Sequence, residues 1–297
     1  ELFELLSRAG LFVRGERITE LGRWMSHIRK SKATRLVVSL LEDEPYASSR
    51  HAVAAHFGKW VALGARAIAK ACGLDTIEIL VDASELSAYD ELAAEAGMSH
   101  IAVEVKFPIA TKRLLKQFAG RGSAILDGIV ACQAGQSLCG ELTCRGSVVT
   151  VAGENQNSPR VILVPDGMAL RDIVADAAGP MIAGGAMRGQ LARETAVTSA
   201  GLELLLSMDP PRNVSMEACM SCGWCRDHCP AKLNVSLLND CFELGRIEVA
   251  QHHGVEQCLD CGACSYVCPS RLALRARMSE LIEAVRRLRS AIGRDEQ

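Results

Sequence analysis

Thiol-bearing residues dominate the chemistry available to this chain. Of its 13 cysteines, eight lie in two short runs near the C-terminus, and both runs have the spacing Cys-x2-Cys-x2-Cys-x3-Cys-Pro. The runs consist of Cys219, Cys222, Cys225 and Cys229, followed by Pro230, and of Cys258, Cys261, Cys264 and Cys268, followed by Pro269. An odd total of cysteines in a chain of this length is not typical of a secreted disulfide scaffold. Crowded thiolates therefore indicate metal ligation in a reducing compartment.

The spacing suits a cubic [4Fe–4S] cluster. Three cysteines at two-residue gaps can wrap one loop around three irons, and a fourth cysteine followed by proline lies beyond a turn. In the two-cluster arrangement the fourth cysteine of each run ligates the other cluster. Zinc also accepts thiolates, but its sites usually use paired Cys-x2-Cys. We predict cluster one on Cys219, Cys222, Cys225 and Cys268, and cluster two on Cys258, Cys261, Cys264 and Cys229.

Such clusters move single electrons and perform no bond chemistry, so the C-terminal region is predicted to be an electron relay. Gly223 and Gly262 would let backbone N–H groups approach the cluster sulfurs. The segment between the runs, 236–251, is predicted to form helix, turn and helix. In the tail from Arg275, apolar residues recur at helical spacing and are interpreted as a docking face.

The remaining cysteines and the histidines give weaker signals. Cys132, Cys139 and Cys144 match no iron–sulfur spacing and are expected to be buried thiols; a third metal site or a redox pair is the alternative. Cys72 and Cys241 are expected in helix cores. Four histidines are interpreted as structural or surface residues, namely His100, His228, His252 and His253.

The front of the chain has the pattern of alternating strands and helices. Strands are predicted at 34–41, 76–82, 100–106 and 128–133, and helices at 50–72, 84–97 and 108–118. Repeated strand–helix–strand units form a parallel sheet covered by helices. The predicted fold class is therefore α/β, with a Rossmann-like parallel-sheet domain.

Two further regions follow this domain. Residues 145–178 have short strands and one helix, which predicts a small β-grasp module, and the glycine-rich stretch 179–189 is interpreted as turns because it lacks the Gly-Lys-Ser/Thr of a P-loop. Pro210-Pro211 marks a linker. The predicted domains are an α/β domain at 1–140, the β-grasp module at 141–190, a linker at 191–212, and a helical two-cluster ferredoxin-like domain with a C-terminal helix at 213–297.

Composition excludes several function classes. With 33 Lys and Arg against 35 Asp and Glu, the formal net charge is −2, which argues against nucleic-acid binding because that requires a basic surface. The sequence has no 18-residue apolar run that would span a membrane and no signal-peptide pattern at its start. A cytoplasmic protein is expected, which is compatible with peripheral attachment to a membrane complex or with enclosure in a microcompartment.

Several segments together resemble the RnfC family, which is related to the flavin-binding subunit of respiratory complex I and to microcompartment cobalamin reductase. They are the acidic turn LEDEPY (41–46), KFPIATKRLLKQFAG (106–120), RGSVVTVAG (145–153), GPMIAGGAMRG (179–189) and CSYVCPSR (264–271). The resemblance implies an FMN and NADH site lined by the turn carboxylates Glu42 and Glu44. It also implies two clusters and membership of a larger redox complex.

The loop that holds flavin in that family departs from the family pattern. The family has Gly-x-Gly-Gly-x-Gly-Phe-Pro-Thr, whereas LFVRGERITELGRW (11–24) keeps only Gly15 and Gly22. Side chains such as Phe12, Arg14, Arg17 and Ile18 would block the approach of backbone N–H groups to a phosphate, and Glu16 would repel it. We predict that the FMN and NADH site is lost and that Glu42 and Glu44 are its remnants.

The leading hypothesis is an electron-transfer subunit of a hetero-oligomer. It would relay electrons through two [4Fe–4S] clusters between redox partners such as a ferredoxin, a flavoprotein or subunits of a membrane complex. One alternative is an FMN-dependent NADH dehydrogenase or corrinoid reductase. Another is an interaction module with purely structural clusters.

Overall fold

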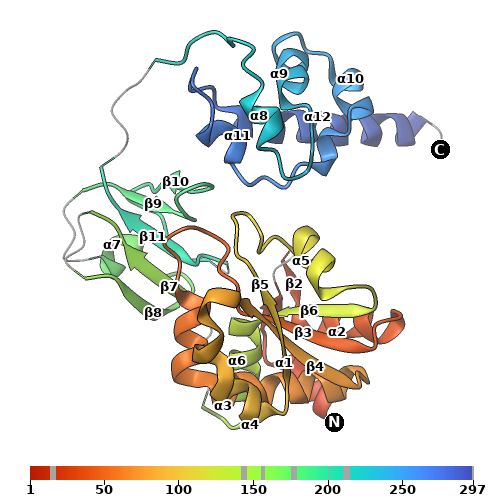
Figure 1. The fold of residues 1–297 in the computed structure, drawn as a ribbon, viewed down its shortest axis with the longest axis vertical. Coiled ribbons are helices and arrows are strands. Elements are labelled where there is room, and N and C mark those ends of the chain that lie inside the picture. The colour runs from red at the N-terminus through yellow and green to blue at the C-terminus, as the bar shows by residue number, and fades with distance from the viewer. Residues whose placement is uncertain are drawn as a thin grey trace. The chain divides into compact units, whose positions relative to one another are not determined.

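The computed structural model describes residues 1–13, 18–141, 146–154, 158–174, 179–199, 201–209 and 215–295. The chain forms two compact units, Glu1–Asp209 and Pro210–Gln297 (Figure 1). The first unit contains a parallel sheet and a second, mixed sheet. The second unit is helical.

Four parallel strands form the central sheet of the first unit, in the order β5-β4-β3-β6. Their bounds are β3 (Arg35–Ser39), β4 (Thr76–Asp82), β5 (Ser99–Val103) and β6 (Ser123–Asp127). On β3 the successive residues Leu36, Val37 and Val38 are all buried, as expected for a parallel strand that is covered on both faces. The predicted α/β class with a parallel sheet is confirmed.

Helices cover both faces of this sheet. Leu36 and Val38 pack in the cluster that contains α3 (Ser49–Cys72) and α6 (Gly128–Leu138), whereas Val37 packs with α5 (Lys112–Ala119). Helices α3 and α6 approach so closely that a Cβ added to Gly64 would lie 1.9 Å from the Ala131 carbonyl oxygen. The other elements of this layer are α1 (Leu2–Arg8), β1 (Phe12–Val13), β2 (Thr19–Glu20), α2 (Leu21–Lys30), η1 (Ala83–Tyr89) and α4 (Asp90–Ala96).

The predicted strand at 128–133 is wrong. That stretch begins α6, and the fourth strand is the preceding segment, β6. The Asp127 side chain accepts a hydrogen bond of 2.8 Å from the Ile129 backbone N–H and so caps the helix. A short apolar run has no clear periodicity, so the sequence does not distinguish the buried start of a helix from a strand.

The predicted helices have different outcomes. The helix at 50–72 is confirmed as α3, and Gly73 ends it in the left-handed conformation. The segment 84–97 is divided between the 3-10 helix η1 and α4. The helix predicted from residue 108 begins only after Thr111.

The second sheet has five strands in the order β10-β9-β11-β7-β8. Its elements are β7 (Gly146–Ala152), β8 (Arg160–Pro165), α7 (Leu170–Ile173), β9 (Met181–Ala183), β10 (Gln190–Leu191) and β11 (Leu204–Ser207). The predicted order of strand, strand and helix is present. The glycine-rich stretch also contributes a strand, and β11 lies within 191–212, so the sheet extends into the stretch interpreted as linker. Pro210 and Pro211 lie outside the described residues.

The second unit has short helices and one long helix, α12, around one apolar core. They are α8 (Trp224–Asp227), α9 (Val235–Glu243), α10 (Ile247–His252), η2 (Val255–Gln257), α11 (Ala263–Tyr266) and α12 (Leu274–Asp295). The predicted helices between the cysteine runs and in the tail are present. Met278, Leu281 and Val285 of α12 pack into this core, so the stripe interpreted as a docking face holds the unit together.

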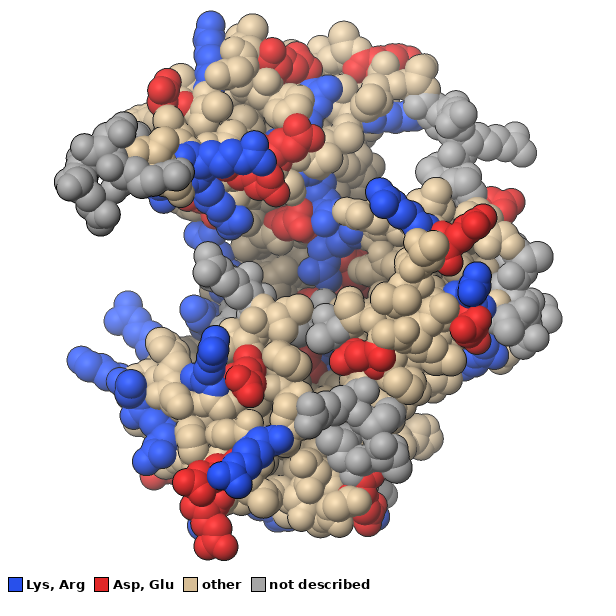
Figure 2. Space-filling model, turned by 180° about the vertical axis from the view of Figure 1, so that it is seen from behind, with Lys and Arg blue, Asp and Glu red and all other residues tan. Residues whose placement is uncertain are grey.

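Charged side chains of both signs are interspersed over the visible surface (Figure 2), in keeping with the near-neutral sequence. Across the described residues, none of the helices combines the length and the apolar character that crossing a bilayer requires.

Candidate metal centres and the acidic turn

The two cysteine runs fold into the same backbone shape. In each run a glycine with φ of +81°, Gly223 or Gly262, precedes a four-residue helix. The residue two positions before that glycine is also left-handed, with φ of 56° at Ser221 and 52° at Asp260. The second run therefore repeats the first at a constant offset, which places equivalent cysteines at equivalent points of the loop.

Each run contributes three cysteines to one cavity and its fourth to the other. One cavity is lined by Cys219, Cys222 and Cys225 together with Cys268 of the second run. The other is lined by Cys258, Cys261 and Cys264 together with Cys229 of the first run. Both cavities have a volume of about 20 Å³. The structure thus brings together the two sets of four cysteines that the crossed arrangement requires.

Backbone amides point at sulfurs within these sets. The Leu233 N–H donates to Cys229 Sγ and the Asp260 N–H donates to Cys258 Sγ, both at 3.4 Å. Amide donors of this kind stabilise negative charge on sulfur and are typical of ligated thiolates.

The cysteines crowd one another electrostatically. Burial raises the pKa of Cys258 to about 11 and that of Cys264 to about 12, and repulsion from the neighbouring thiolates of the same cavity adds to the shift. Burial likewise raises the pKa of Cys225, to which charges on Cys219, Cys222 and Cys268 contribute. Without a cation the sets favour neutral thiols, so binding a metal would release protons.

The donor chemistry of each cavity fits an iron–sulfur cube. Four thiols face each space, and the apolar core of the unit lies behind them. Within the described part of the chain, no group of three Cys, His, Asp or Glu side chains is arranged to hold a single metal ion.

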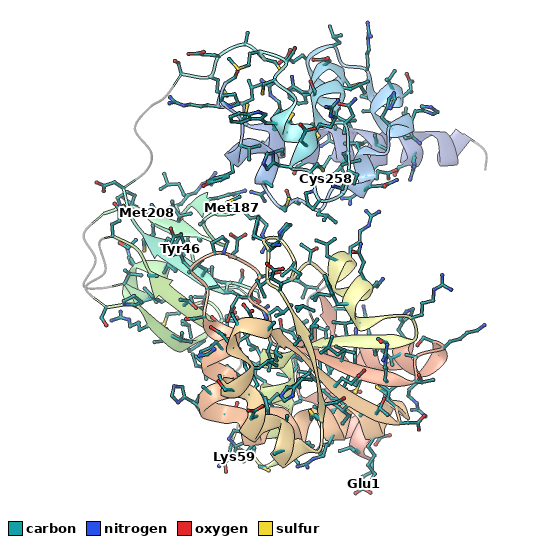
Figure 3. The ribbon with its side chains drawn as sticks, viewed as in Figure 1. Glu1, Tyr46, Lys59, Met187, Met208 and Cys258 are labelled. Carbon is teal, nitrogen blue, oxygen red and sulfur yellow. The ribbon has the colours of Figure 1, made fainter. Side chains whose placement is uncertain are left out.

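The acidic turn is occupied by arginines of the same chain. Glu42 accepts hydrogen bonds from the Arg50 backbone N–H at 2.6 Å and the His51 backbone N–H at 3.1 Å, and it pairs with the Arg50 guanidinium at 3.3 Å. Glu44, which is buried, pairs with Arg188 and accepts from the Met187 backbone N–H at 2.9 Å. Tyr46 of the turn and Met187 lie on the same side of the first unit (Figure 3).

Arg50 is the centre of a buried ion cluster. Its guanidinium lies 2.6 Å from Asp127 Oδ2 and 2.7 Å from Glu203 Oε1, in addition to Glu42. Despite burial, these carboxylates hold the pKa of Arg50 above its usual value, and burial raises the pKa of Glu42 against the influence of Arg50. Because Glu203 immediately precedes β11, the cluster ties the second sheet to the first.

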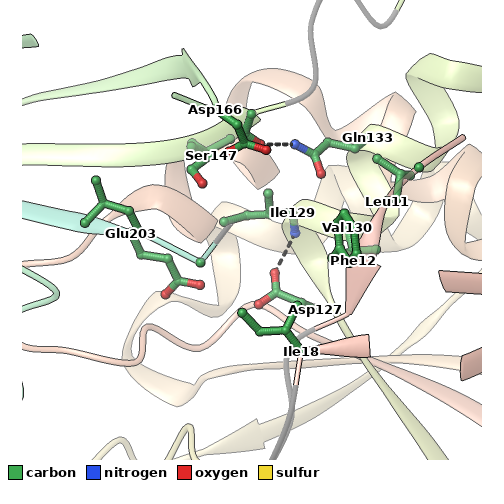
Figure 4. A pocket seen from close by; sticks show the side chains of 15 residues that line it. Leu11, Phe12, Ile18, Asp127, Ile129, Val130, Gln133, Ser147, Asp166 and Glu203 are labelled. Carbon is green, nitrogen blue, oxygen red and sulfur yellow. Dashed lines mark hydrogen bonds between the residues drawn. The ribbon is translucent and has the colours of Figure 1, made fainter. Parts of the chain in front are cut away.

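A pocket of about 70 Å³ lies beside this cluster, at the carboxyl end of β6 (Figure 4). Carboxylates of Asp127, Asp166 and Glu203 line it, together with Phe12 and Ile18. Such a position is where open α/β sheets bind nucleotides, with phosphate at a helix N-terminus. Here Asp127 itself caps the N-terminus of α6, so a carboxylate takes the place that a phosphate would need.

Other predicted residues fall in several places. Glu42 and Glu44 are not among the described residues that line the pocket. Residues 14–17 of the altered loop and Cys144 lie outside the described residues.

Cys72, Cys132 and Cys241 are buried as predicted, whereas Cys139 is exposed, so its expected burial is wrong. His228, His252 and His253 are exposed and His100 is half-buried, in line with the expectation for them.

Sequence reasoning missed four residues of these ion pairs, namely Arg50, Asp127, Arg188 and Glu203. Asp127 before an apolar run was a readable N-cap signal. The other three had none, because their partners come from segments far away in the chain.

Comparisons with known proteins support the fold. No protein-family model matches the sequence, and no curated protein matches it. The chain is similar to a chain of NAD+-reducing [NiFe]-hydrogenase in the H2-reduced state, with a TM-score of 0.62 and 14% identity over 96% of this chain and 62% of that chain. It is also similar to a chain of this hydrogenase in the air-oxidized state, with a TM-score of 0.57 and 12% identity over 94% of this chain and 53% of that chain.

This chain spans less than two thirds of either hydrogenase chain. At identities this low, the structural likeness shows a shared fold and leaves the activity open. The resemblance to RnfC remains a prediction.

Proposed function

We propose that this protein is an iron–sulfur electron-transfer subunit that relays single electrons through two [4Fe–4S] clusters within a larger redox complex. The observation that carries the proposal is the exchange of the fourth cysteine between the runs, which leaves four thiols around each cavity. When bound, the cubes supply reversible one-electron oxidation and reduction.

The chain's own residues would hold and insulate the clusters. Cluster one would be held by Cys219, Cys222, Cys225 and Cys268, and cluster two by Cys258, Cys261, Cys264 and Cys229. The amides of Leu233 and Asp260 orient sulfurs through hydrogen bonds. Core residues such as Leu238 and Val255, both fully buried, keep water from the inner side.

We further propose that the FMN and NADH site has been lost. The turn carboxylates Glu42 and Glu44 are already neutralised by Arg50 and Arg188. The α6 N-terminus is capped by Asp127. An incoming flavin phosphate would therefore meet carboxylate in place of unpaired N–H groups.

The fold likeness supports membership of a hetero-oligomeric redox complex. The similar chains belong to a hydrogenase that reduces NAD+, and this chain covers only part of them. We expect redox proteins as partners, with no nucleic acid.

Electron paramagnetic resonance on anaerobically purified protein tests the proposal. Dithionite should produce signals from two magnetically interacting clusters, and a potentiometric titration should reduce and reoxidise both reversibly. Clusters that form but cannot be cycled would show a structural role and refute the relay.

An FMN-dependent NADH dehydrogenase or corrinoid reductase is the second candidate. The observation that favours it is the fold likeness to chains of an NAD+-reducing enzyme across nearly the whole of this chain. NADH added to the anaerobic protein separates the two candidates: bleaching of the cluster absorbance supports the dehydrogenase, and an unchanged spectrum supports the loss of the site.

A further inference from the structure

The two cysteine runs have the same backbone shape but differ in how far their cysteine side chains are exposed to solvent. In the first run Cys219 and Cys222 are exposed. At the equivalent positions of the second run Cys258 is half-buried and Cys261 is buried. At the third position the order is reversed, because Cys225 is buried and Cys264 is half-buried, so the greater exposure of the first run is confined to its first two cysteines.

Large apolar side chains surround the first set and are open to solvent. Met216 and Met220 are each 62% exposed and Trp224 is 53% exposed. None of the equivalent residues of the second run is exposed, and two of the three are smaller: they are Val255, Leu259 and Ala263. The repeated fold thus does not require large exposed apolar residues at these positions.

An ion pair covers the second set. Arg275 pairs with Asp260 at 2.7 Å, and the Arg275 backbone N–H donates to Ser265 Oγ at 2.8 Å. At the positions equivalent to Asp260 and Arg275 the first run has Ser221 and Ser236. The charged side chains that hold α12 over the second loop therefore have short, neutral counterparts at the first.

The surface around the first set is nearly neutral. Between residues 215 and 229 the charged side chains are Glu217, Arg226 and Asp227, and Arg226 pairs with Asp227 at 3.2 Å. The exposed Arg271 follows Ser270, whose carbonyl accepts from the Glu217 backbone N–H, so it adds one positive charge and the sum is zero. Nucleic acid or an anionic membrane would require a basic surface. Methionine and tryptophan in a region with few charges are typical of the core of a protein–protein interface, so the complementary surface is apolar and uncharged.

We propose that Met216, Met220 and Trp224 form an exchange face on which a one-electron carrier protein docks. The carrier would present an apolar, uncharged surface around the edge of its own cofactor. One electron would pass between that cofactor and the centre held by Cys219, Cys222, Cys225 and Cys268, without making or breaking a bond and without transfer of a proton. This inference rests on the proposed function and adds the site at which electrons enter or leave.

Stopped-flow oxidation of the dithionite-reduced holoprotein by rubredoxin tests the exchange face. The salt is set to roughly 1 M, where the screening length is about 3 Å, so that distant charges do not govern the rate. Trp224→Ala should lower the second-order rate constant about fivefold or more, as expected when an interface anchor is truncated. Tyr266→Ala is the matched control, because Tyr266 is a 79% exposed aromatic residue in the second run, and it should leave the rate unchanged.

A measurement without a partner gives the second readout. A neutral dysprosium chelate in solution should speed relaxation of one of the two cluster signals, and this should be the signal that Cys222→Ser removes. Slowing by Tyr266→Ala without slowing by Trp224→Ala would overturn the proposal. So would stronger relaxation of the other signal, or an unaffected pair, which would mean that the chain's own first unit covers the face. Protein that binds no iron would refute the proposed function itself.

Discussion

The two units differ in how their clustered acidic groups are stabilised. In the second unit, four thiols face each cavity, and burial together with their mutual repulsion raises pKa values such as that of Cys264. In the first unit, the carboxylates at the carboxyl end of the sheet are held by Arg50 and Arg188. One site needs an added cation to be stable in its ionised form, and the other is already neutralised. That contrast supports the proposal that the second unit, and not the first, holds a cofactor.

Removing iron should have the largest effect and should affect one unit alone. Chelation under anaerobic, reducing conditions should unfold the second unit, because its short helices surround the ligand loops and metal binding is coupled to folding in such domains. Limited proteolysis followed by mass spectrometry should show cleavage at many sites within the second unit, while the first unit stays resistant. Loss of both units, or of neither, would contradict the contrast.

Cysteine substitutions sharpen the comparison within the second unit. Cys222→Ser and Cys268→Ser should each remove the same cluster signal and about half of the iron, because the two residues line one cavity. Cys264→Ser should remove the other signal. Resonance spectra and iron analysis check this, and different signals lost in the Cys222 and Cys268 variants would refute crossed ligation.

Arg50→Met tests the neutralised site. It would leave three carboxylates around a buried position, and breaking a buried ion pair from one side costs about 3–5 kcal/mol. Arg171→Met is the control, because the pair of Arg171 with Asp172 is exposed at 3.7 Å and should contribute at most about 1 kcal/mol. Urea unfolding followed by fluorescence of the buried Trp24 and Trp60 measures both. Equal losses of stability in the two variants would contradict a stabilising role of the buried Arg50 ion cluster.

The smallest expected effect is the pH dependence of stability that two buried thiols of the first unit cause. Burial raises the pKa of Cys72 to about 11 and that of Cys132 to about 12 from a usual 9.0. Their folded-state pKa values exceed the unfolded ones, so the stability they contribute is full below pH 9 and is lost as pH rises toward 11 to 12. The loss is at most about 1.4 kcal/mol per pH unit for each thiol. Cys132→Ala should flatten the decline between pH 9 and 11 in thermal melts, and an unchanged slope would contradict it.

Local patterns were predictable from sequence, and long-range contacts were not. The cysteine runs, α3 and β4 follow from spacing and periodicity within one segment, so they were found. The sequence did not separate β6 from α6, because both are short and apolar, and Asp127 at their junction was the available signal. The Arg50 cluster joins residues of α3, β6 and the approach to β11, and only the packed structure brings them together.

A cofactor inventory tests the central claim most directly. Protein purified without oxygen should contain about eight iron and about eight sulfide per chain, the content of two cubes, with no flavin in the acid extract. Stoichiometric flavin would contradict the loss of the nucleotide site, and iron far below that content would contradict the paired clusters.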